Sequence, residues 1–228
     1  MDKIAIEPIA YIQTAFKEKF GIPRQSGLAD LTEAKIVFTS FYRDKEALRG
    51  IEEYSHIWLI FGFSKVKYEK WSPTVRPPRL GGNTKMGVFA SRSPFRPNGL
   101  GLSCVRLLRV EETEKEGTVL VVSGADLLDG TPIYDIKPYL TFTDCHSDAI
   151  CGFADNVKDY ALKVEFSKEV EKSLDKATLE AVVQCISQDP RPSYQDEPER
   201  VYYMKYEKYD IGFRVNGDCA IIISVKLL

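Results

Sequence analysis

Apolar positions in the first two thirds of the chain follow the spacing of β-strands. Residues 35–41 alternate between apolar and polar, and residues 54–63 form a near-continuous apolar run with many aromatic and β-branched side chains. A run of this length and composition predicts a buried central strand. Further strands are expected at residues 4–12, 86–90, 103–110 and 118–123, the last two joined as a hairpin by a charged turn.

Helix is scarce in the same region, where one short helix is expected at residues 44–50. Many short strands with little helix favour an antiparallel or mixed barrel, or a sandwich, over a doubly wound sheet. The common dinucleotide and methyl-donor folds need long crossover helices, and none is visible. No GxGxxG follows a predicted strand either. The fold class is therefore predicted to be mainly β.

The pattern changes after about residue 147. Residues 167–187 carry apolar side chains at helical spacing, with Ser167 as the N-cap and Asp189-Pro190 as the stop. Strands are expected at 201–206, 211–215 and 220–227. We predict two domains, a mainly β domain over residues 1–149 and a small α+β domain over residues 150–228.

Composition adds expectations about the compartment and about metal. The chain of 228 residues has five scattered cysteines, which argues against a disulfide framework. Cys145, His146 and Cys151 lack CxxC spacing and a fourth ligand, so no metal site is expected there. The start shows no signal-peptide core, and no stretch approaches the roughly 20 apolar residues that span a bilayer. A cytoplasmic location is expected.

Positive charge is concentrated in one region. Between Lys65 and Arg96 there is one acid, Glu69, and a local excess of +7 in a chain whose net charge is −2. Such a patch, stiffened by four prolines, suits phosphate groups, although a solvated loop without a specific role stays an alternative. The positive residues are Lys65, Lys67, Lys70, Arg76, Arg79, Lys85, Arg92 and Arg96.

Three segments carry candidate chemistry. In residues 87–103, Arg92 and Arg96 can hold anions, and glycines allow backbone amides to approach a ligand closely. Residues 125–140 place three aspartates and a lysine around the turn 129–132, where carboxylates could hold hydroxyl or ammonium groups, accept a proton or bind Mg²⁺. The third segment, residues 20–28, is a loop that says little alone.

Together these segments resemble the TsaA-like family, also called the YaeB or TrmO family, whose bacterial members are tRNA methyltransferases. The matching text is KEKFGIPRQSGL, EALRGIEEYSHIWLIFGF, RPPRLGGNTKMGVFASRSPFRPNGLGLS and DLLDGTPIYDIKPYL. The resemblance covers about residues 4–147, and SQDPRPSYQ at 187–195 is similar to the C-terminal extension of the bacterial members. It implies a single-sheet β-barrel that binds S-adenosylmethionine without a Rossmann fold.

The resemblance also implies a reaction and partners. The reaction is methyl transfer to N6 of threonylcarbamoyl-adenosine at tRNA position 37, by a homodimer with the donor near the subunit interface. Ser64 stands where family members often have histidine, and Gly99-Leu100 where Pro-Ile is common. The implied donor-binding residues are Pro23, Arg24, Gln25, Ser64, Lys65, Arg92, Leu102, Asp129, Gly130, Thr131 and Pro132.

Methylation of an exocyclic nitrogen needs alignment and loss of a proton rather than a covalent nucleophile. Polar groups just after the donor-binding turn are therefore the candidates for proton acceptor or substrate orienter, whereas His56, in an apolar strand, is expected in the core. These catalytic candidates are Asp126, Asp135, Lys137 and Tyr139.

The tRNA anticodon loop is expected over the basic region between Lys65 and Arg96. Tyrosines of the second domain could add stacking surfaces or could be core residues on alternating strand positions. Two other functions stay open, namely a non-catalytic RNA-binding module and a metal-dependent hydrolase that uses Asp126, Asp129 and Asp135. The tyrosines are Tyr194, Tyr202, Tyr203, Tyr206 and Tyr209.

Overall fold

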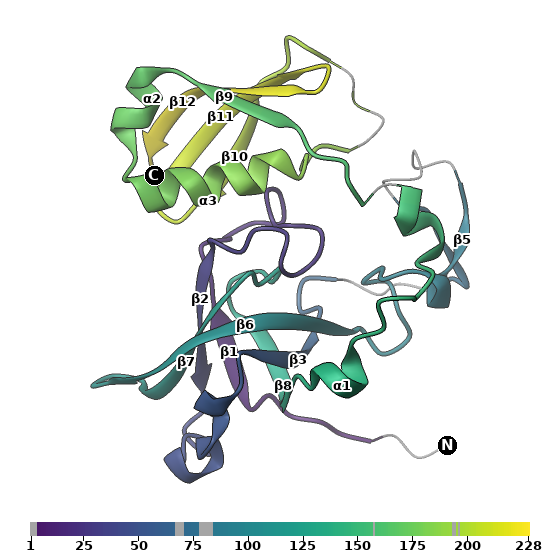
Figure 1. Cartoon of the computed structure of the whole chain (residues 1–228), viewed down its shortest axis with the longest axis vertical. Coiled ribbons are helices and arrows are strands. Elements are labelled where there is room, and N and C mark those ends of the chain that lie inside the picture. Colours follow the sequence, from purple (N-terminus) through teal and green to yellow (C-terminus); the bar gives the residue numbers. More distant parts are fainter. Residues whose placement is uncertain (1–3, 67–70, 78–83, 157, 193–194, 196) are drawn as a thin grey trace.

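The chain folds into two strand-rich bodies, one above the other in Figure 1. The computed structural model describes residues 4–66, 71–77, 84–156, 158–192, 195 and 197–228. The prediction of a mainly β chain is confirmed. Within the described residues, no helix is both long and apolar enough to cross a membrane.

Six strands of the N-terminal body close into a barrel in the order β1-β2-β7-β6-β3-β8. Every neighbouring pair is antiparallel, and β8 returns to β1 through the pair Ala10↔Ile133. Alternate side chains point inward, so that Ile12, Leu59 and Leu120 are completely buried. The strands are β1 (Ala10–Gln13), β2 (Glu33–Phe38), β3 (His56–Gly62), β6 (Leu100–Thr113), β7 (Gly117–Ser123) and β8 (Thr131–Pro138).

The central strand and the long hairpin lie where the apolar pattern predicts them, as β3 and as β6 with β7. Two shorter elements differ. The expected helix at 44–50 is two 3-10 turns, η1 (Lys45–Leu48) and η2 (Ile51–Glu53). The expected strand at 86–90 is only β5 (Met86–Gly87), which pairs with β4 (Thr74–Val75) and continues as the 3-10 turn η4 (Val88–Ala90).

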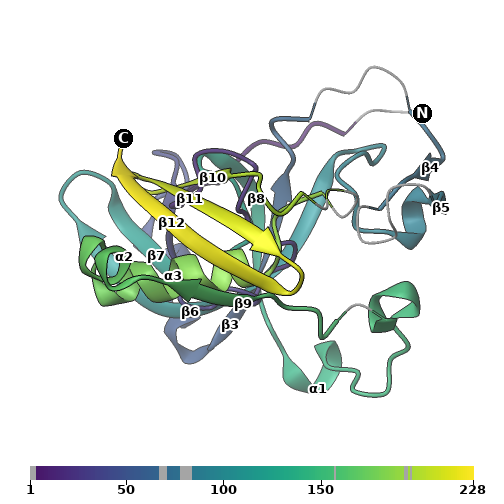
Figure 2. The ribbon, with the colours of Figure 1, turned by 90° about the horizontal axis from the view of Figure 1, so that it is seen from above.

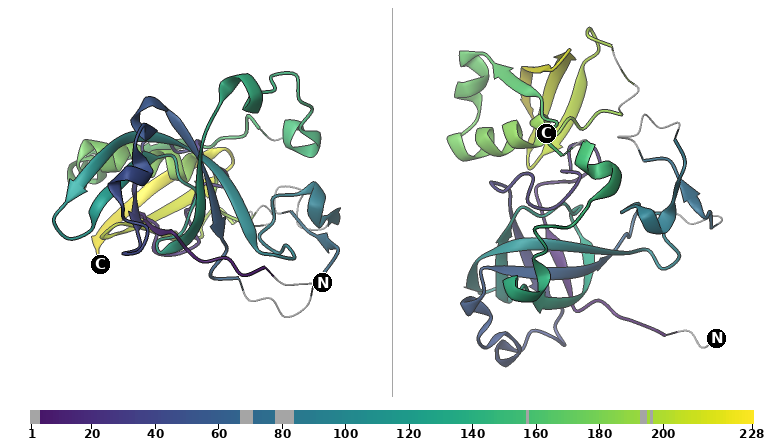
Figure 3. Two further views of the ribbon diagram at one scale, coloured as in Figure 1. Left: turned by 90° about the horizontal axis from the view of Figure 1, so that it is seen from below. Right: turned by 45° about the vertical axis from the view of Figure 1, so that its right-hand side comes forward.

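The antiparallel order brings three long connections to the same end of the barrel. Strands β1, β3 and β7 finish at this end, and β2, β6 and β8 begin there. The connections at this end are therefore a first loop (14–32), a second loop (63–99) and a third loop (124–130). The right-hand view of Figure 3 shows the β5 part of the second loop standing off from the side of the barrel.

The C-terminal body is a four-stranded sheet in the order β10-β11-β12-β9, with β9 parallel to β12. Helices α2 and α3 cover one face of it (Figure 2). The helix expected at 167–187 is broken because Leu174 is extended and Asp175 caps α3 through Thr178 N. The elements here are β9 (Lys163–Phe166), α2 (Lys168–Ser173), α3 (Lys176–Ser187), β10 (Tyr202–Tyr206), β11 (Tyr209–Asn216) and β12 (Cys219–Leu227), with α1 (Thr141–Asp144) and η5 (Gly152–Asn156) before them.

The first loop belongs to the second hydrophobic core although it lies between two barrel strands. Ala15, Phe16 and Ala29 are buried in the same cluster as α3 and the C-terminal sheet. Gly21 has φ +93°, and a Cβ there would lie 2.3 Å from Met204 Cγ. Backbone closure is added by Glu207 N, which donates to the Ala15 carbonyl at 3.0 Å. The first loop therefore connects the two bodies.

Gly21→Ala should reveal how tightly this contact is packed. The substitution combines the cost of a positive φ, about 1 kcal/mol for a residue with a Cβ, with overlap on a completely buried Met204. We expect a total loss of roughly 2–4 kcal/mol in the free energy of unfolding, measured by urea denaturation. Gly27→Ala is the matched control, since Gly27 has φ +79° and open space around its Cβ position. Equal losses in the two variants would show that the Met204 contact adds nothing.

Candidate active site at one end of the barrel

The sequence-predicted donor residues, far apart along the chain, gather at the end of the barrel that carries the three long loops. Pro23, Arg24 and Gln25 lie in the first loop, and Ser64, Lys65 and Arg92 in the second. Leu102 is the third residue of β6. Asp129 and Gly130 close the third loop, and Thr131 and Pro132 begin β8.

The centre of this end is a cluster of four side chains, called the donor cluster below. Arg92 Nη1 donates to Gln25 Oε1 at 2.6 Å, and Ser103 Oγ donates to Asp126 Oδ1 at 2.5 Å. Burial raises the pKa of the Asp126 carboxyl above its usual range, although Ser103, the Arg92 charge and the Ser26 backbone amide each act to lower it. The donor cluster thus holds a poorly solvated carboxylate beside an exposed guanidinium.

The Asp129 turn is fixed by contacts to the first loop. Thr14 N donates to Asp129 Oδ1 at 2.9 Å, and Lys17 Nζ lies 2.8 Å from Oδ2. Gly130 takes φ +74° and donates its N–H to the Ile12 carbonyl. The Asp129 carboxylate therefore holds the turn in place, and the turn presents its exposed Gly130 backbone to solvent.

Ser64 and Lys65 are exposed directly after β3. Lys19 Nζ donates to the Lys65 carbonyl at 3.2 Å, which places a first-loop cation beside them. Lys17 and Lys19 were missed by sequence reasoning. Their only sequence signal is their position just before the FGIPRQSGL segment.

The outer surface of the barrel carries the other catalytic candidates. Cross-strand pairing puts Leu102, Ile60 and Asp135 in one row, and Lys137 beside Trp58 in the next. Leu102 is 56% exposed, and Lys137 Nζ lies 3.1 Å from Asp135 Oδ2. Residues in such a row lie side by side on the sheet surface, so Asp135 is grouped with Leu102 rather than with the donor cluster.

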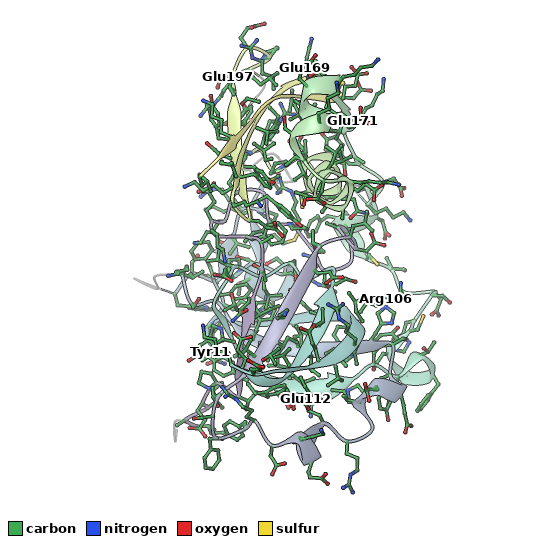
Figure 4. The ribbon with its side chains drawn as sticks, turned by 90° about the vertical axis from the view of Figure 1, so that its left-hand side faces the viewer. Tyr11, Arg106, Glu112, Glu169, Glu171 and Glu197 are labelled. Carbon is green, nitrogen blue, oxygen red and sulfur yellow. The ribbon has the colours of Figure 1, made fainter. Side chains whose placement is uncertain are left out.

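Tyr139 lies farther from the loops, near the opposite end of β8. Its ring packs against Trp58 and His56, with centroids 5.7 and 6.1 Å apart. At about 3.3 Å per residue it is roughly 13 Å beyond Asp135 along the strand. The expectation that His56 is a core residue is wrong, because the ring is half-buried on the outer face and its Nδ1 bonds Ser55 Oγ at 2.9 Å. Arg106, which pairs with His56, extends from the same outer surface (Figure 4).

The three aspartates proposed for a hydrolase do not meet. Asp126 is in the donor cluster, Asp129 is bound to Thr14 and Lys17, and Asp135 is on the outer face. Within the described part of the chain, no group of three His, Cys, Asp or Glu side chains is placed to hold a metal ion. The arrangement gives the hydrolase alternative no ligand set.

The positive residues of the basic loop region differ in exposure: most of the described ones face solvent, and the guanidinium of one is bound within the protein. Lys65, Arg76, Lys85 and Arg92 are exposed. Arg96, predicted to hold an anion, is half-buried instead, and its Nη1 donates to the carbonyls of Val88 and Ser91 at 3.2 and 2.6 Å because these acceptors need a donor inside the turn. Lys67, Glu69, Lys70 and Arg79 lie outside the described residues.

Exposed aromatic rings lie in the same loop as the exposed cations. Trp71, Phe89 and Phe95 are 60%, 73% and 57% exposed. The Arg96 guanidinium carbon lies 5.9 Å from the Phe89 ring centroid, so that Arg96 also makes a cation–π contact with this ring. Neither phenylalanine was predicted as a surface residue; Phe89 lies in a segment predicted as a strand, where a phenylalanine usually indicates a core position.

Two of the second-domain tyrosines are core residues. Tyr202 and Tyr206 are buried on the helix-covered face of the sheet, and Tyr209 packs at its edge. Tyr203 is 50% exposed on the other face, and Tyr194 lies outside the described residues. The alternation of β10 therefore leaves one tyrosine of that strand exposed for stacking.

Comparison with known proteins identifies the family of this chain. The family model described as the tRNA-methyltransferase O N-terminal domain matches residues 11–145, and the TrmO C-terminal domain matches residues 159–228. A tRNA (adenine(37)-N6)-methyltransferase of Escherichia coli K12 is 40% identical over 225 residues, covering 94% of each chain. The relative of the same name from Eikenella corrodens is 52% identical over 174 residues, covering 75% of this chain and 97% of the relative.

The solved structures give the same result. A crystal structure of TrmO from Pseudomonas aeruginosa superimposes with a TM-score of 0.77 at 35% identity, covering 99% of this chain and 100% of the other. Both family models and full-length relatives span the two bodies described above. The chain belongs to the tRNA-methyltransferase O family.

Proposed function

We propose that this chain methylates N6 of threonylcarbamoyl-adenosine at tRNA position 37, with S-adenosylmethionine as the methyl donor. Curated relatives at 40% and 52% identity are named tRNA (adenine(37)-N6)-methyltransferases, and a further one is named an S-adenosylmethionine-dependent methyltransferase. The observation that carries the proposal is the donor cluster, in which the charge of the exposed Arg92 acts on the part-buried Asp126 carboxylate at the end of the barrel.

The chemistry of the side chains fits the donor. Arg92 can bind the α-carboxylate of the donor. Leu102 offers apolar surface, and Gly130 leaves the backbone of the turn open to close approach. When bound, S-adenosylmethionine supplies an electrophilic methyl group. The proposed binding set is Pro23, Arg24, Gln25, Ser64, Lys65, Arg92, Leu102, Asp129, Gly130, Thr131 and Pro132.

The remaining task of the protein is proton removal and orientation. N6 loses a proton during methylation, and a carboxylate whose pKa is raised by burial is a stronger base than an exposed one. Asp126 is therefore the proposed proton acceptor. Asp135, Lys137 and Tyr139 are proposed as substrate orienters on the outer face, with Asp135 nearest to Leu102.

The RNA partner is assigned to the basic loop region. Exposed cations bind phosphates, and exposed rings stack on unpaired bases of an anticodon loop. The apolar outer row of Leu102 and Ile60 supports a homodimer in which the partner covers this face. The two cores support the division at residues 149 and 150, with the first loop shared, and a tRNA substrate supports a cytoplasmic location.

Nucleoside mass spectrometry tests the reaction. Purified protein, S-adenosylmethionine and tRNA bearing threonylcarbamoyl-adenosine should give a product heavier by one methyl group on that nucleoside. The same tRNA without the threonylcarbamoyl group is the control for substrate choice. Methylation of both would leave an adenine-37 methyltransferase with a broader substrate, and methylation of neither would overturn the proposal.

Asp126→Asn should remove the acid limb of the single-turnover rate. The ionised carboxylate is the active form, so the wild-type rate rises with pH through a pKa above the ordinary value for aspartate, about 4. The variant should be slower by about 100-fold and flat in this range. Asp148→Asn, in an exposed loop, is the matched control. A wild-type acid limb retained in Asp126→Asn would exclude this residue as the base.

The same variant should remain folded. A raised folded-state pKa means that Asp126 contributes stability only below the unfolded pKa, and this contribution is lost as pH rises through the folded pKa. At neutral pH the ionised group is a cost, so Asp126→Asn should unfold at a temperature no lower than wild type. A slow but stable variant thereby separates a chemical role from misfolding.

Phe89→Ala combined with Phe95→Ala should weaken binding of an anticodon stem-loop by at least about tenfold, because each stacked base contributes about 1–3 kcal/mol. The dependence of affinity on salt should not change, whereas Lys85→Ala should reduce it by about one phosphate contact. Phe142→Ala, 87% exposed on α1, is the control. Unchanged affinity in the double variant, measured by fluorescence anisotropy, would place the RNA elsewhere.

A further inference from the structure

A buried ion pair follows α3 in the C-terminal body. Arg191 Nε and Nη2 donate to the two carboxylate oxygens of Asp189 at 2.8 and 3.0 Å. The residues are 7% and 8% exposed, and Tyr160 OH adds a bond to Asp189 Oδ2 at 2.8 Å. Burial alone would raise the pKa of Asp189, but the bonds from Arg191 and Tyr160 outweigh it and lower that pKa. The pair is therefore a permanent charged clamp.

The clamp fixes backbone groups that point at the first loop. Arg24 Nη2 donates to the carbonyls of both Asp189 and Arg191, at 2.9 and 2.8 Å. A bidentate ion pair across residues 189 and 191 sets the spacing of these two carbonyls. The backbone of Asp189 has φ +48°, a conformation that a residue other than glycine adopts only when its surroundings hold it there. One nitrogen of Arg24 thus binds two carbonyl groups whose positions are fixed within the C-terminal body.

Arg24 is continuous with the donor cluster. Gln25 Nε2 donates to the Arg24 carbonyl at 2.6 Å, which turns Gln25 Oε1 toward Arg92 Nη1 at 2.6 Å. The charge of Arg92 and the backbone amide of Ser26, which follows Gln25, both act to lower the pKa of Asp126. A run of hydrogen bonds therefore leads from the C-terminal core to Arg92, whose charge acts on the Asp126 carboxylate.

We propose that Asp189 and Arg191 are positioning residues for the methyl-donor site, acting through Arg24 on Gln25 and Arg92. The C-terminal body then sets the affinity for the donor without placing a side chain of its own in the donor cluster. Arg24, a member of the proposed binding set, contributes to donor binding through this tie between the two bodies. The inference rests on the proposed use of S-adenosylmethionine at the donor cluster.

A double-mutant cycle on donor affinity tests this. Asp189→Asn places an amide where Arg191 needs an acceptor, and Arg24→Met keeps the side-chain length without the donors. Calorimetric titration with S-adenosylmethionine should show Kd raised about tenfold in each, the size of one charge-assisted hydrogen bond. The double variant should be no weaker than the weaker single one, since residues that act through each other are non-additive.

Two controls separate positioning from loss of structure. Glu199→Gln breaks an exposed ion pair with Arg214 in the same body and should leave Kd unchanged. Each variant is titrated well below its own unfolding temperature, because partial unfolding would reduce the number of binding sites rather than raise Kd. Arg191→Lys, which keeps the charge without the bidentate contact, should fall between wild type and Asp189→Asn.

Contrary outcomes are distinct. An Asp189→Asn variant that binds as tightly as Glu199→Gln overturns the positioning role. Additive effects of Asp189→Asn and Arg24→Met also overturn it, because Arg24 then acts on the donor directly. Failure of the wild-type protein to bind S-adenosylmethionine would instead overturn the proposed function, so the two failures are told apart.

Discussion

The structure depends on one loop that must satisfy two bodies at once. Residues 14–32 leave the barrel from β1 and return to it as β2, yet Phe16 and Ala29 are buried in the core of the C-terminal body. The same loop directs Gln25 toward Arg92 and the backbone amide of Ser26 toward Asp126. Because Gly21 is packed directly against Met204, the loop has little room to shift. A change in the contact between the two bodies would therefore also change the geometry of the site.

The donor cluster holds a carboxylate that is only partly stabilised by its neighbours in the protein. Asp126 receives a hydroxyl, a backbone amide and the field of one guanidinium, and burial still outweighs them in raising its pKa. A carboxylate in that balance gains from any further hydrogen-bond donor or positive charge that approaches it. Asp129 is the contrast, since Thr14 and Lys17 already satisfy its oxygens. Of the two aspartates, Asp126 has binding capacity left to offer.

The local pattern of apolar residues was sufficient to predict the central strand and the long hairpin of the barrel. The apolar run that became β3 and the alternating hairpin β6–β7 needed no knowledge of their neighbours. The roles of Arg24 and Arg96 could not be predicted, because each guanidinium is bound by carbonyls whose positions depend on the folded chain, for Arg24 about 165 residues away. In sequence, an arginine that binds a ligand and one that binds a backbone look alike. The exposure of Phe89 and Phe95 could not be predicted either, because residue type alone does not show whether an aromatic ring is buried or exposed.

The same reasoning bears on Ser64, where family members often have histidine. The position is exposed just after β3, and its neighbour Lys65 has its carbonyl bound by Lys19 Nζ. This edge of the site therefore carries the side chains of Lys19 and Lys65 without an imidazole. Without an imidazole at this edge, the proposed proton acceptor stays Asp126, whose pKa burial raises. Any role that an imidazole has at this position in other family members is absent from this chain.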